Sequence, residues 1–230
     1  MVQWLPASAA VLPRAANALG IPTALPSVDG VLLSFDDGPH PQGTPAVLAA
    51  LDQARAPAVF FVSGEQAATH PDLLREIAAA GHELALHGYR HQTRRQWSGK
   101  LLADDTQRAL DTVSAAAGAL PRLYRPPYGV FTLTGLLLIR GLDLQPLLWS
   151  KWGRDWERRA TTTTITDHVT AGIRAGDVVL LHDADHYGAR GSWRATAAAL
   201  PEIAERITAA GLQAASVRRG PAHDGLTLTH

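Results

Sequence analysis

The chain has 230 residues, of which 46% are apolar and 18% are charged, a composition that suits a globular fold with a sizeable core. Basic and acidic residues both number 21, so the net charge is zero and no basic field predicts binding to nucleic acid or to an anionic membrane. Cysteine is absent, which excludes disulfides and thiolate ligands, and any metal site must therefore use histidine and carboxylate.

The N-terminal stretch is apolar but is interrupted by Pro6, Pro13, Pro22 and Pro26. It has neither a basic start nor an unbroken apolar run, so we expect neither a signal peptide nor a membrane span here. The pattern over residues 8–19 suits one short amphipathic helix, and we expect residues 1–30 to pack on the domain as an extension. The location stays open: extracytoplasmic or wall-associated if a leader has been removed, cytoplasmic otherwise.

Strand-like and helix-like stretches alternate after residue 29. The predicted strands cover residues 31–35, 58–62, 83–87, 122–125, 144–149, 178–182 and 213–217. The predicted helices cover residues 44–55, 71–80, 100–119, 132–140, 161–175 and 193–210. This alternation implies right-handed crossovers and a parallel sheet, and about seven units predict a (β/α) barrel, with an open doubly wound sheet as the alternative. We expect one domain over residues 31–217 and a flexible polar tail over 218–230.

Two adjacent aspartates, Asp36 and Asp37, follow the apolar run of residues 31–35. The end of a buried strand is a poor place for two unpaired charges, although a solvated turn is the simpler alternative. Other polar residues also fall at or just after predicted strands: His87, Arg125, Asp155 and His182. Because the C-terminal ends of parallel strands share one face, we expect these side chains to converge.

His87 and His91 are four residues apart, a spacing that aims both imidazoles at one point. Alone the pair is weak evidence, since one buried and one exposed histidine would give the same pattern. The aspartates at an equivalent strand end favour a metal site, because two imidazoles and one carboxylate form an open divalent-metal site with room for water. A bound metal lowers the pKa of that water, and the second aspartate is then available as a general base.

Five motifs occur in order along the chain: SFDDGPHP, HGYRH, RPPYG, WSKWGRDW and LLHD. Together they resemble those of the NodB-homology polysaccharide deacetylases, carbohydrate esterase family 4. The resemblance extends from about Val31 to Val217. It implies a distorted (β/α) barrel, in agreement with the alternation of strands and helices.

The resemblance also implies roles for particular residues. Asp37, His87 and His91 would be the metal ligands. Asp36 would be the base that activates the metal-bound water, and His182 would be the general acid that protonates the departing amine. The implied cofactor is one divalent metal, most suitably zinc, with cobalt, nickel, manganese or iron as alternatives.

The remaining implied roles concern support and substrate contact. Arg125 resembles the arginine that holds the catalytic aspartate, and Asp155 the aspartate that orients the acid histidine. The backbone N–H of Tyr128 would help to stabilise the oxyanion. Trp156 and Leu180 resemble the walls of a small acetyl pocket.

Two departures from the family pattern stand out. Gly88 occupies a position where the family usually has a serine or threonine whose hydroxyl braces the metal loop. Trp152 stands where an aspartate is common, and we interpret it either as a sugar-stacking residue or as part of the rim. We interpret Trp149 as a core residue and expect Asp183 to form a local hydrogen bond.

The second histidine pair, His182 and His186 in HDADH, is a rival metal site. The resemblance argues against it, because it assigns His182 to proton transfer. His91 belongs only to the first site and His186 only to the rival site, so these two histidines distinguish the alternatives.

The leading hypothesis is hydrolytic removal of acetyl groups from N-acetylglucosamine oligomers or polymers, such as chitin oligomers or peptidoglycan. Rival hypotheses are an O-acetyl xylan esterase, a small-molecule amide or imide hydrolase, and an inactive carbohydrate-binding relative. The last is disfavoured because both aspartates and all three site histidines are present. We expect a carbohydrate substrate, no nucleic-acid partner, no membrane span and a monomer.

Overall fold

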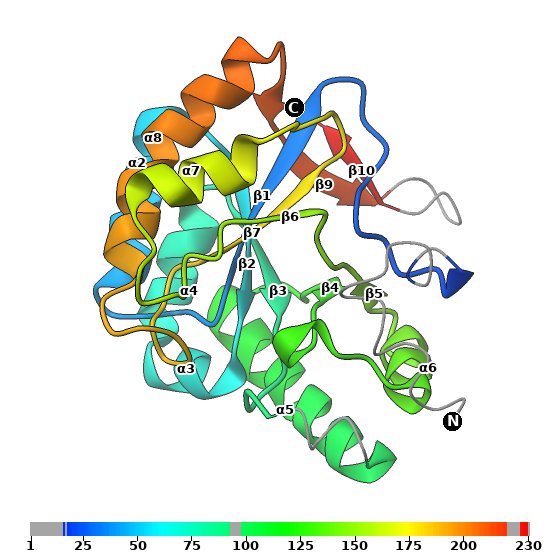
Figure 1. Ribbon diagram of the computed structural model, residues 1–230. Helices are drawn as coiled ribbons and strands as arrows, with labels where there is room; N and C mark the ends of the chain where they lie inside the picture. Colours follow the sequence, from blue (N-terminus) through cyan, green and yellow to red (C-terminus); the bar gives the residue numbers. More distant parts are fainter. Residues whose placement is uncertain (1–15, 17, 93–97, 220–225, 230) are drawn as a thin grey trace.

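The computed structural model describes residue 16 and residues 18–92, 98–219 and 226–229 (Figure 1). An eight-stranded parallel sheet forms the centre of this described part. Seven strands follow the spatial order β5-β4-β3-β2-β1-β7-β6, and β8 pairs with the start of β1. The strands are β1 (Gly30–Asp36), β2 (Ala58–Val62), β3 (Glu83–Leu86), β4 (Leu123–Tyr124), β5 (Gln145–Pro146), β6 (Lys151–Trp152), β7 (Val178–His182) and β8 (Gln213–Ala214). The prediction of a distorted (β/α) barrel is confirmed.

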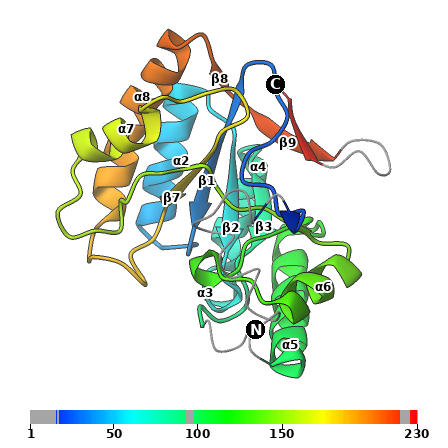
Figure 2. The same ribbon diagram turned by 45° about the vertical axis from the view of Figure 1, so that its right-hand side comes forward.

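Helices cover the outside of the sheet (Figures 1 and 2). They are α2 (Gly43–Ala54), α3 (Gly64–Thr69), α4 (Pro71–Ala79), α5 (Gly99–Ala117), α6 (Leu133–Gly141), α7 (Thr162–Thr170) and α8 (Trp193–Ala209), with a 3₁₀ turn η3 (Pro127–Gly129). Several begin at a side-chain cap: Ser98 accepts from the backbone of α5, Thr132 from that of α6 and Thr161 from that of α7. Such caps satisfy backbone N–H groups that have no partner within the helix.

The central strand β1 is buried along its whole length, which explains its unbroken apolar run. Its side chains alternate between two layers. Val31, Leu33 and Phe35 belong to the large core cluster between sheet and helices, whereas Leu32 belongs to the smaller cluster on the inner face. The same alternation puts Asp36 on the inner face, at the end of the strand.

The two edge strands of the sheet, β5 and β6, are not hydrogen-bonded to each other; instead, the chain itself crosses from one edge to the other. β5 and β6 are neighbours in sequence but lie at opposite edges of the sheet. The N–H of Leu147 still donates to Tyr124 O, at 3.1 Å, whereas that of Ser150 donates to Val178 O on the other edge, at 3.0 Å. Residues 147–150 therefore cross the seam, and the N–H of Leu148 donates to Pro22 O of the N-terminal stretch at 2.9 Å.

The structure differs from the sequence prediction at β5 and β6 and at the C-terminus. The strand predicted over residues 144–149 is reduced to the two residues of β5, because the chain leaves β4 after residue 147, and β6, which pairs with β7, lies beyond the predicted range. In place of the predicted flexible tail, β9 (Ser216–Arg219) and β10 (Leu226–Thr229) form an antiparallel pair. Leu226 and Leu228 alternate along β10 and are each only 7% exposed, so burial of these two side chains stabilises the strand.

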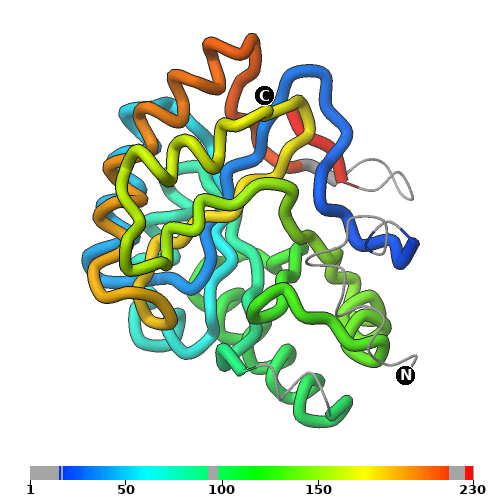
Figure 3. The backbone as a smooth tube through the Cα atoms, viewed as in Figure 1, coloured from blue at the N-terminus to red at the C-terminus, as the bar shows by residue number. Residues whose placement is uncertain are grey.

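The stretch that leads into β1 lies beside β10 (Figure 3), where the N–H of Leu228 donates to Pro26 O at 3.2 Å. Most of the helix predicted over residues 8–19 falls outside the described residues. None of the described helices has the length and apolar character that a membrane crossing requires.

Candidate active site

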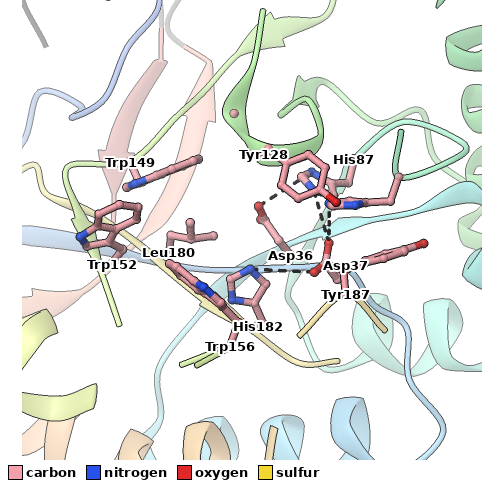
Figure 4. Close-up of a pocket in the computed structure, with 12 residues that line it drawn as sticks. Asp36, Asp37, His87, Tyr128, Trp149, Trp152, Trp156, Leu180, His182 and Tyr187 are labelled. Carbon is pink, nitrogen blue, oxygen red and sulfur yellow. Dashed lines mark ion pairs between the residues drawn. The ribbon is translucent and has the colours of Figure 1, made fainter. Parts of the chain in front are cut away.

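A cavity of about 210 Å³ opens at the C-terminal ends of the strands. Nine of the eleven residues to which the sequence analysis gives a role in the site line it: Asp36, Asp37, His87, His91, Tyr128, Trp152, Trp156, Leu180 and His182. The remaining two, Arg125 and Asp155, are fully buried behind the lining. Figure 4 shows the cavity with an apolar side, made by the tryptophans and Leu180, and a polar side, made by the aspartates and histidines.

Asp37, His87 and His91 form a cluster whose donor atoms lie within 4.8 Å of one another. Asp37 Oδ1 is 3.4 Å from His87 Nε2 and 3.3 Å from His91 Nε2. His87 Nδ1 lies 2.8 Å from the carbonyl oxygen of Arg125, which fixes the proton on Nδ1 and leaves the Nε2 lone pair directed at the cluster. Asp37 Oδ1 is buried and accepts no hydrogen bond of good geometry from the described residues. An orphaned carboxylate oxygen beside two imidazoles fits a divalent cation.

Both pKa shifts in this cluster favour the protonation states that metal ligands need. Burial alone would raise the pKa of Asp37, but its interactions with His87, His182 and His91 lower it to about 2. Burial, together with the neighbouring His87, lowers the pKa of His91 to about 4 despite the opposing effect of Asp37. The cluster therefore presents an ionised carboxylate and a neutral imidazole at neutral pH.

The backbone of the loop that carries the two histidines is held from two sides. The N–H groups of Gly64 and Glu65 donate to the carbonyls of Gly88 and Tyr89, both at 3.0 Å. On the other side, the N–H of Tyr89 donates to Asp105 Oδ2 on α5 at 2.8 Å. Gly88 has φ +78°, a left-handed conformation that glycine adopts without strain. Asp105 thus braces this loop, a role that the sequence analysis missed.

Arg125 holds Asp36 through a buried ion pair. Its Nη1 lies 2.7 Å from Asp36 Oδ1 and also donates to Ser34 Oγ at 3.0 Å. Its Nε and Nη2 donate to the carbonyls of Leu147 and Leu148, both at 3.0 Å. Asp36, two backbone carbonyls of the seam and one serine therefore accept the guanidinium's hydrogen bonds.

His182 is paired with a buried aspartate. Its Nδ1 lies 2.9 Å from Asp155 Oδ1, and its backbone N–H donates to Asp155 Oδ2 at 2.7 Å. Thr196 Oγ1 donates to the same Oδ2 at 2.8 Å, which fixes the carboxylate. Burial alone would lower the pKa of His182, but Asp155 raises it to about 10. The imidazole is therefore protonated at neutral pH, with Nε2 facing Asp37 Oδ2 at 3.9 Å.

Three tryptophans form a row along the apolar side. The ring centroids of Trp149 and Trp152 are 6.2 Å apart, and those of Trp152 and Trp156 are 5.6 Å apart. The interpretation of Trp149 as a core residue was incomplete, because it packs against both core clusters and also lines the cavity. Tyr187 lines the opposite side, stacked on His91 with centroids 3.9 Å apart.

The structure does not place Asp183 in a local hydrogen bond or His186 in a metal site. Asp183 is buried and accepts from Thr44 Oγ1 on α2, 139 positions away, so its hydrogen bond is not local. His186 is exposed, and its ring lies 5.2 Å from that of His40. Among the residues that the structure describes, the HDADH segment forms no metal-binding group.

The comparisons with known proteins agree with this geometry. A family model described as polysaccharide deacetylase matches residues 26–147. The chitooligosaccharide deacetylase of Bradyrhizobium sp. strain ANU 289 is 41% identical over 154 residues, 66% of this chain and 70% of that protein. A peptidoglycan-N-acetylglucosamine deacetylase of Bacillus cereus is 33% identical over 156 residues, 66% of this chain and 72% of that protein.

A solved structure extends the likeness to nearly the whole described fold. A family 4 carbohydrate esterase from Streptomyces lividans, in complex with acetate, superimposes with a TM-score of 0.75 at 30% identity. The match covers 86% of this chain and 96% of that one. The chain therefore belongs to the polysaccharide deacetylase family, the NodB-homology group of carbohydrate esterase family 4.

Proposed function

We propose that this protein is a metal-dependent hydrolase that removes acetyl groups from N-acetylated amino sugars, namely N-acetylglucosamine in chitin oligomers or peptidoglycan. The observation that carries this proposal is the convergence of Asp36, Asp37, His87, His91 and His182 on one cavity. The names of the relatives, chitooligosaccharide deacetylase and peptidoglycan-N-acetylglucosamine deacetylase, support the choice of substrate class.

Asp37, His87 and His91 would hold the metal, most suitably zinc, with cobalt, nickel, manganese or iron as alternatives. A metal bound there supplies Lewis-acid chemistry: it lowers the pKa of a water and polarises the acetyl carbonyl. The protein's own contribution is to keep the donor atoms together, since Arg125 O fixes His87 and Asp105 fixes the loop to His91.

Asp36 is the proposed general base. Its Oδ1 is engaged by Arg125 at 2.7 Å, which leaves Oδ2 as the oxygen that takes the proton of the attacking water. The buried guanidinium also fixes the orientation of the carboxylate, because its other donors are anchored on backbone carbonyls. The base therefore needs little rearrangement at the moment of reaction.

His182 is the proposed general acid. Nδ1 stays bonded to Asp155, so the proton on Nε2, which faces the cavity, is the one available to the leaving nitrogen. Water adds to the acetyl carbon and the C–N bond breaks. The amine leaves with the proton from Nε2, and acetate is the other product.

The walls of the cavity match the small acyl group of such a substrate. Trp156 and Leu180 line the apolar side, and the more exposed Trp152 offers a face on which a pyranose ring would stack. The backbone N–H of Tyr128 is the proposed oxyanion donor.

Acetate release from N-acetylglucosamine oligomers and from acetylated xylan, measured in parallel, tests the proposal. Each substrate is tested after chelation and after zinc or cobalt is added back. Metal-restored release from the oligomers is the expected result. Release from xylan alone would favour O-acetyl esterase activity, the alternative suggested by the structure named a carbohydrate esterase. No release from either, with metal bound, would contradict the proposal and point to a smaller amide.

A further inference from the structure

A second cavity, of about 370 Å³, lies on the other side of the loop between β7 and α8. Within this loop Tyr187 lines the catalytic cavity, whereas the next residue, Gly188, lines the second one. Asp185 and Arg190 of the same loop also line it, and the rest of its lining comes from the loop between β1 and α2 and from the first turn of α8. The second cavity thus shares a wall with the proposed active site.

The second cavity carries two guanidinium groups, those of Arg190 and Arg194. Neither forms an ion pair with a carboxylate within the described residues, and both side chains are exposed. The nearby carboxylate of Asp185 is already engaged. Its Oδ1 lies 3.3 Å from His40 Nε2, and its Oδ2 accepts the N–H of Gly191 at 2.5 Å. The lining therefore has a net positive charge with unused donors.

The orientation of His40 explains why Asp185 stays engaged. His40 Nδ1 accepts the N–H groups of Gln42 and Gly43, at 3.2 and 2.9 Å. The proton of the neutral imidazole must then reside on Nε2, which faces Asp185. This contact ties the loop after β1 to the loop after β7 and fixes the floor of the second cavity.

An aromatic surface accompanies the positive charge. Trp193 lines the cavity, and the Cζ of Arg194 lies 4.3 Å from the centroid of its ring. Stacking on the indole limits the motion of this guanidinium, which lowers the entropy lost when it binds an anion. An aromatic ring beside a planar cation is suited to a sugar that carries an acidic group.

A row of rings connects the metal cluster with the second cavity. The centroids of His91 and Tyr187 are 3.9 Å apart, and those of Tyr187 and His186 are 6.2 Å apart. His186 and His40 follow at 5.2 Å, and His40 and Trp193 at 5.9 Å. The two cavities therefore flank one row of packed rings, a separation that a substrate longer than one sugar would span.

The geometry points to the second cavity as a subsite for the carboxylate of an acidic glycan. This inference rests on the proposed function and narrows its substrate class. Arginine binds a carboxylate through two parallel N–H bonds, whereas a neutral glycan offers only hydroxyl and amide groups to the same donors. The substrate class that fits is a polymer in which N-acetylglucosamine alternates with a sugar bearing a carboxylate, rather than uncharged chitin.

The test uses a matched pair of probes: a peptide-free tetrasaccharide of this alternating type, and the same tetrasaccharide with its carboxylates reduced to alcohols. The variant is Arg190→Gln/Arg194→Gln. The control is Arg174→Gln, which removes an exposed charge from the loop before β7, at the opposite end of that strand. We expect the double variant to lose about tenfold in kcat/KM on the carboxylate form and less than about twofold on the reduced form.

Three results would overturn the inference: an equal loss on both probes, no loss on either, or an equal loss in the Arg174 control. Calorimetric binding of both probes to each protein is measured alongside the rates. If neither probe is deacetylated but only the carboxylate form binds, and the double variant abolishes that binding, the subsite stands while the proposed function fails. If deacetylation proceeds and the two probes bind equally, the subsite fails while the proposed function stands.

Discussion

Asp105 on α5 accepts the backbone N–H of Tyr89 at 2.8 Å and thereby holds the loop that places His87 and His91 around one point. We predict that Asp105→Ala lowers zinc affinity by about 10- to 100-fold, because the supports behind metal ligands contribute effects of this size. The measurement is a competition titration of metal-free protein with a chromogenic chelator.

Two further variants separate bracing from general stability. Asp105→Asn keeps an acceptor oxygen and should retain most of the affinity. Asp104→Ala removes an exposed carboxylate from the same turn of α5 and should leave the affinity unchanged. If Asp104→Ala weakens zinc binding as much as Asp105→Ala does, the charge of the helix rather than the hydrogen bond is responsible.

We predict that Asp36→Asn lowers the rate of acetate release by about 10²–10⁴-fold, the usual contribution of a general base. Zinc content should remain at the wild-type value, because Asp36 is not among the three clustered donors. The variant leaves the buried Arg125 without its counter-charge, so circular dichroism must first show that it is folded at the assay temperature. Activity near the wild-type rate, with metal bound, would remove Asp36 from the role of base.

We predict that His182→Ala slows amide hydrolysis by about 10²–10⁴-fold and slows hydrolysis of an activated acetyl ester much less. The amine must be protonated as it leaves, whereas a nitrophenolate leaves without a proton. Rates on an N-acetylglucosamine oligomer and on 4-nitrophenyl acetate, taken from the same preparation, provide the comparison. An equal loss on both substrates would assign His182 to binding rather than to proton donation.

We predict that His91→Ala loses metal whereas His186→Ala keeps it. His91 Nε2 lies 3.3 Å from Asp37 Oδ1, and the exposed His186 lies outside the cluster. Elemental analysis after dialysis against zinc, followed by a buffer wash, gives the metal content of each variant. The reverse result would move the metal to the HDADH segment.

We predict a pH-dependent gain in stability for Glu83→Gln at the start of β3. Burial raises the pKa of Glu83 from 4.5 to about 7, although Arg122 opposes the shift. Because the folded state holds this proton more tightly than the unfolded chain, wild-type stability is lost as the pH rises from about 4.5 to about 7.

Glutamine does not titrate, so only the wild type loses stability over this range. The free energy of unfolding of the variant, relative to that of the wild type, should therefore rise by roughly 1–3 kcal/mol from pH 5 to pH 8. Urea denaturation at the two pH values measures the difference. The control is Glu205→Gln on α8, which changes an exposed glutamate and should show no such gain. A constant difference between Glu83→Gln and the wild type at both pH values would contradict the prediction.

The sequence was sufficient to predict the β/α alternation and the shared edge on which the polar residues meet. The reason is physical: β1 is apolar on both faces and can only be a buried parallel strand, so Asp36 and Asp37 had to emerge at the edge where sites are built. The cavity lined by both aspartates and by His87, His91 and His182 follows from the same placement.

Other features could not be predicted because they depend on partners that are distant in sequence. β6 has two residues and therefore no period to detect. Asp105 sits beside Asp104 on an amphipathic helix, and only the fold shows that one is buried against the loop and the other is exposed. Leu226 and Leu228 follow a polar, glycine-containing stretch, so their alternation was too short to outweigh that composition.

The seam crossed by residues 147–150 has a consequence for how this fold can diversify. Leu148 and Trp149 form no hydrogen bond with a neighbouring strand through their backbone N–H groups. The crossing nevertheless places Trp149 along the cavity, and the carbonyls of Leu147 and Leu148 accept hydrogen bonds from Arg125. An inserted or deleted residue there would reshape the acyl pocket and shift the anchor of the base without disrupting any strand pair. Evolution can therefore retune the substrate range at this crossing while the scaffold persists.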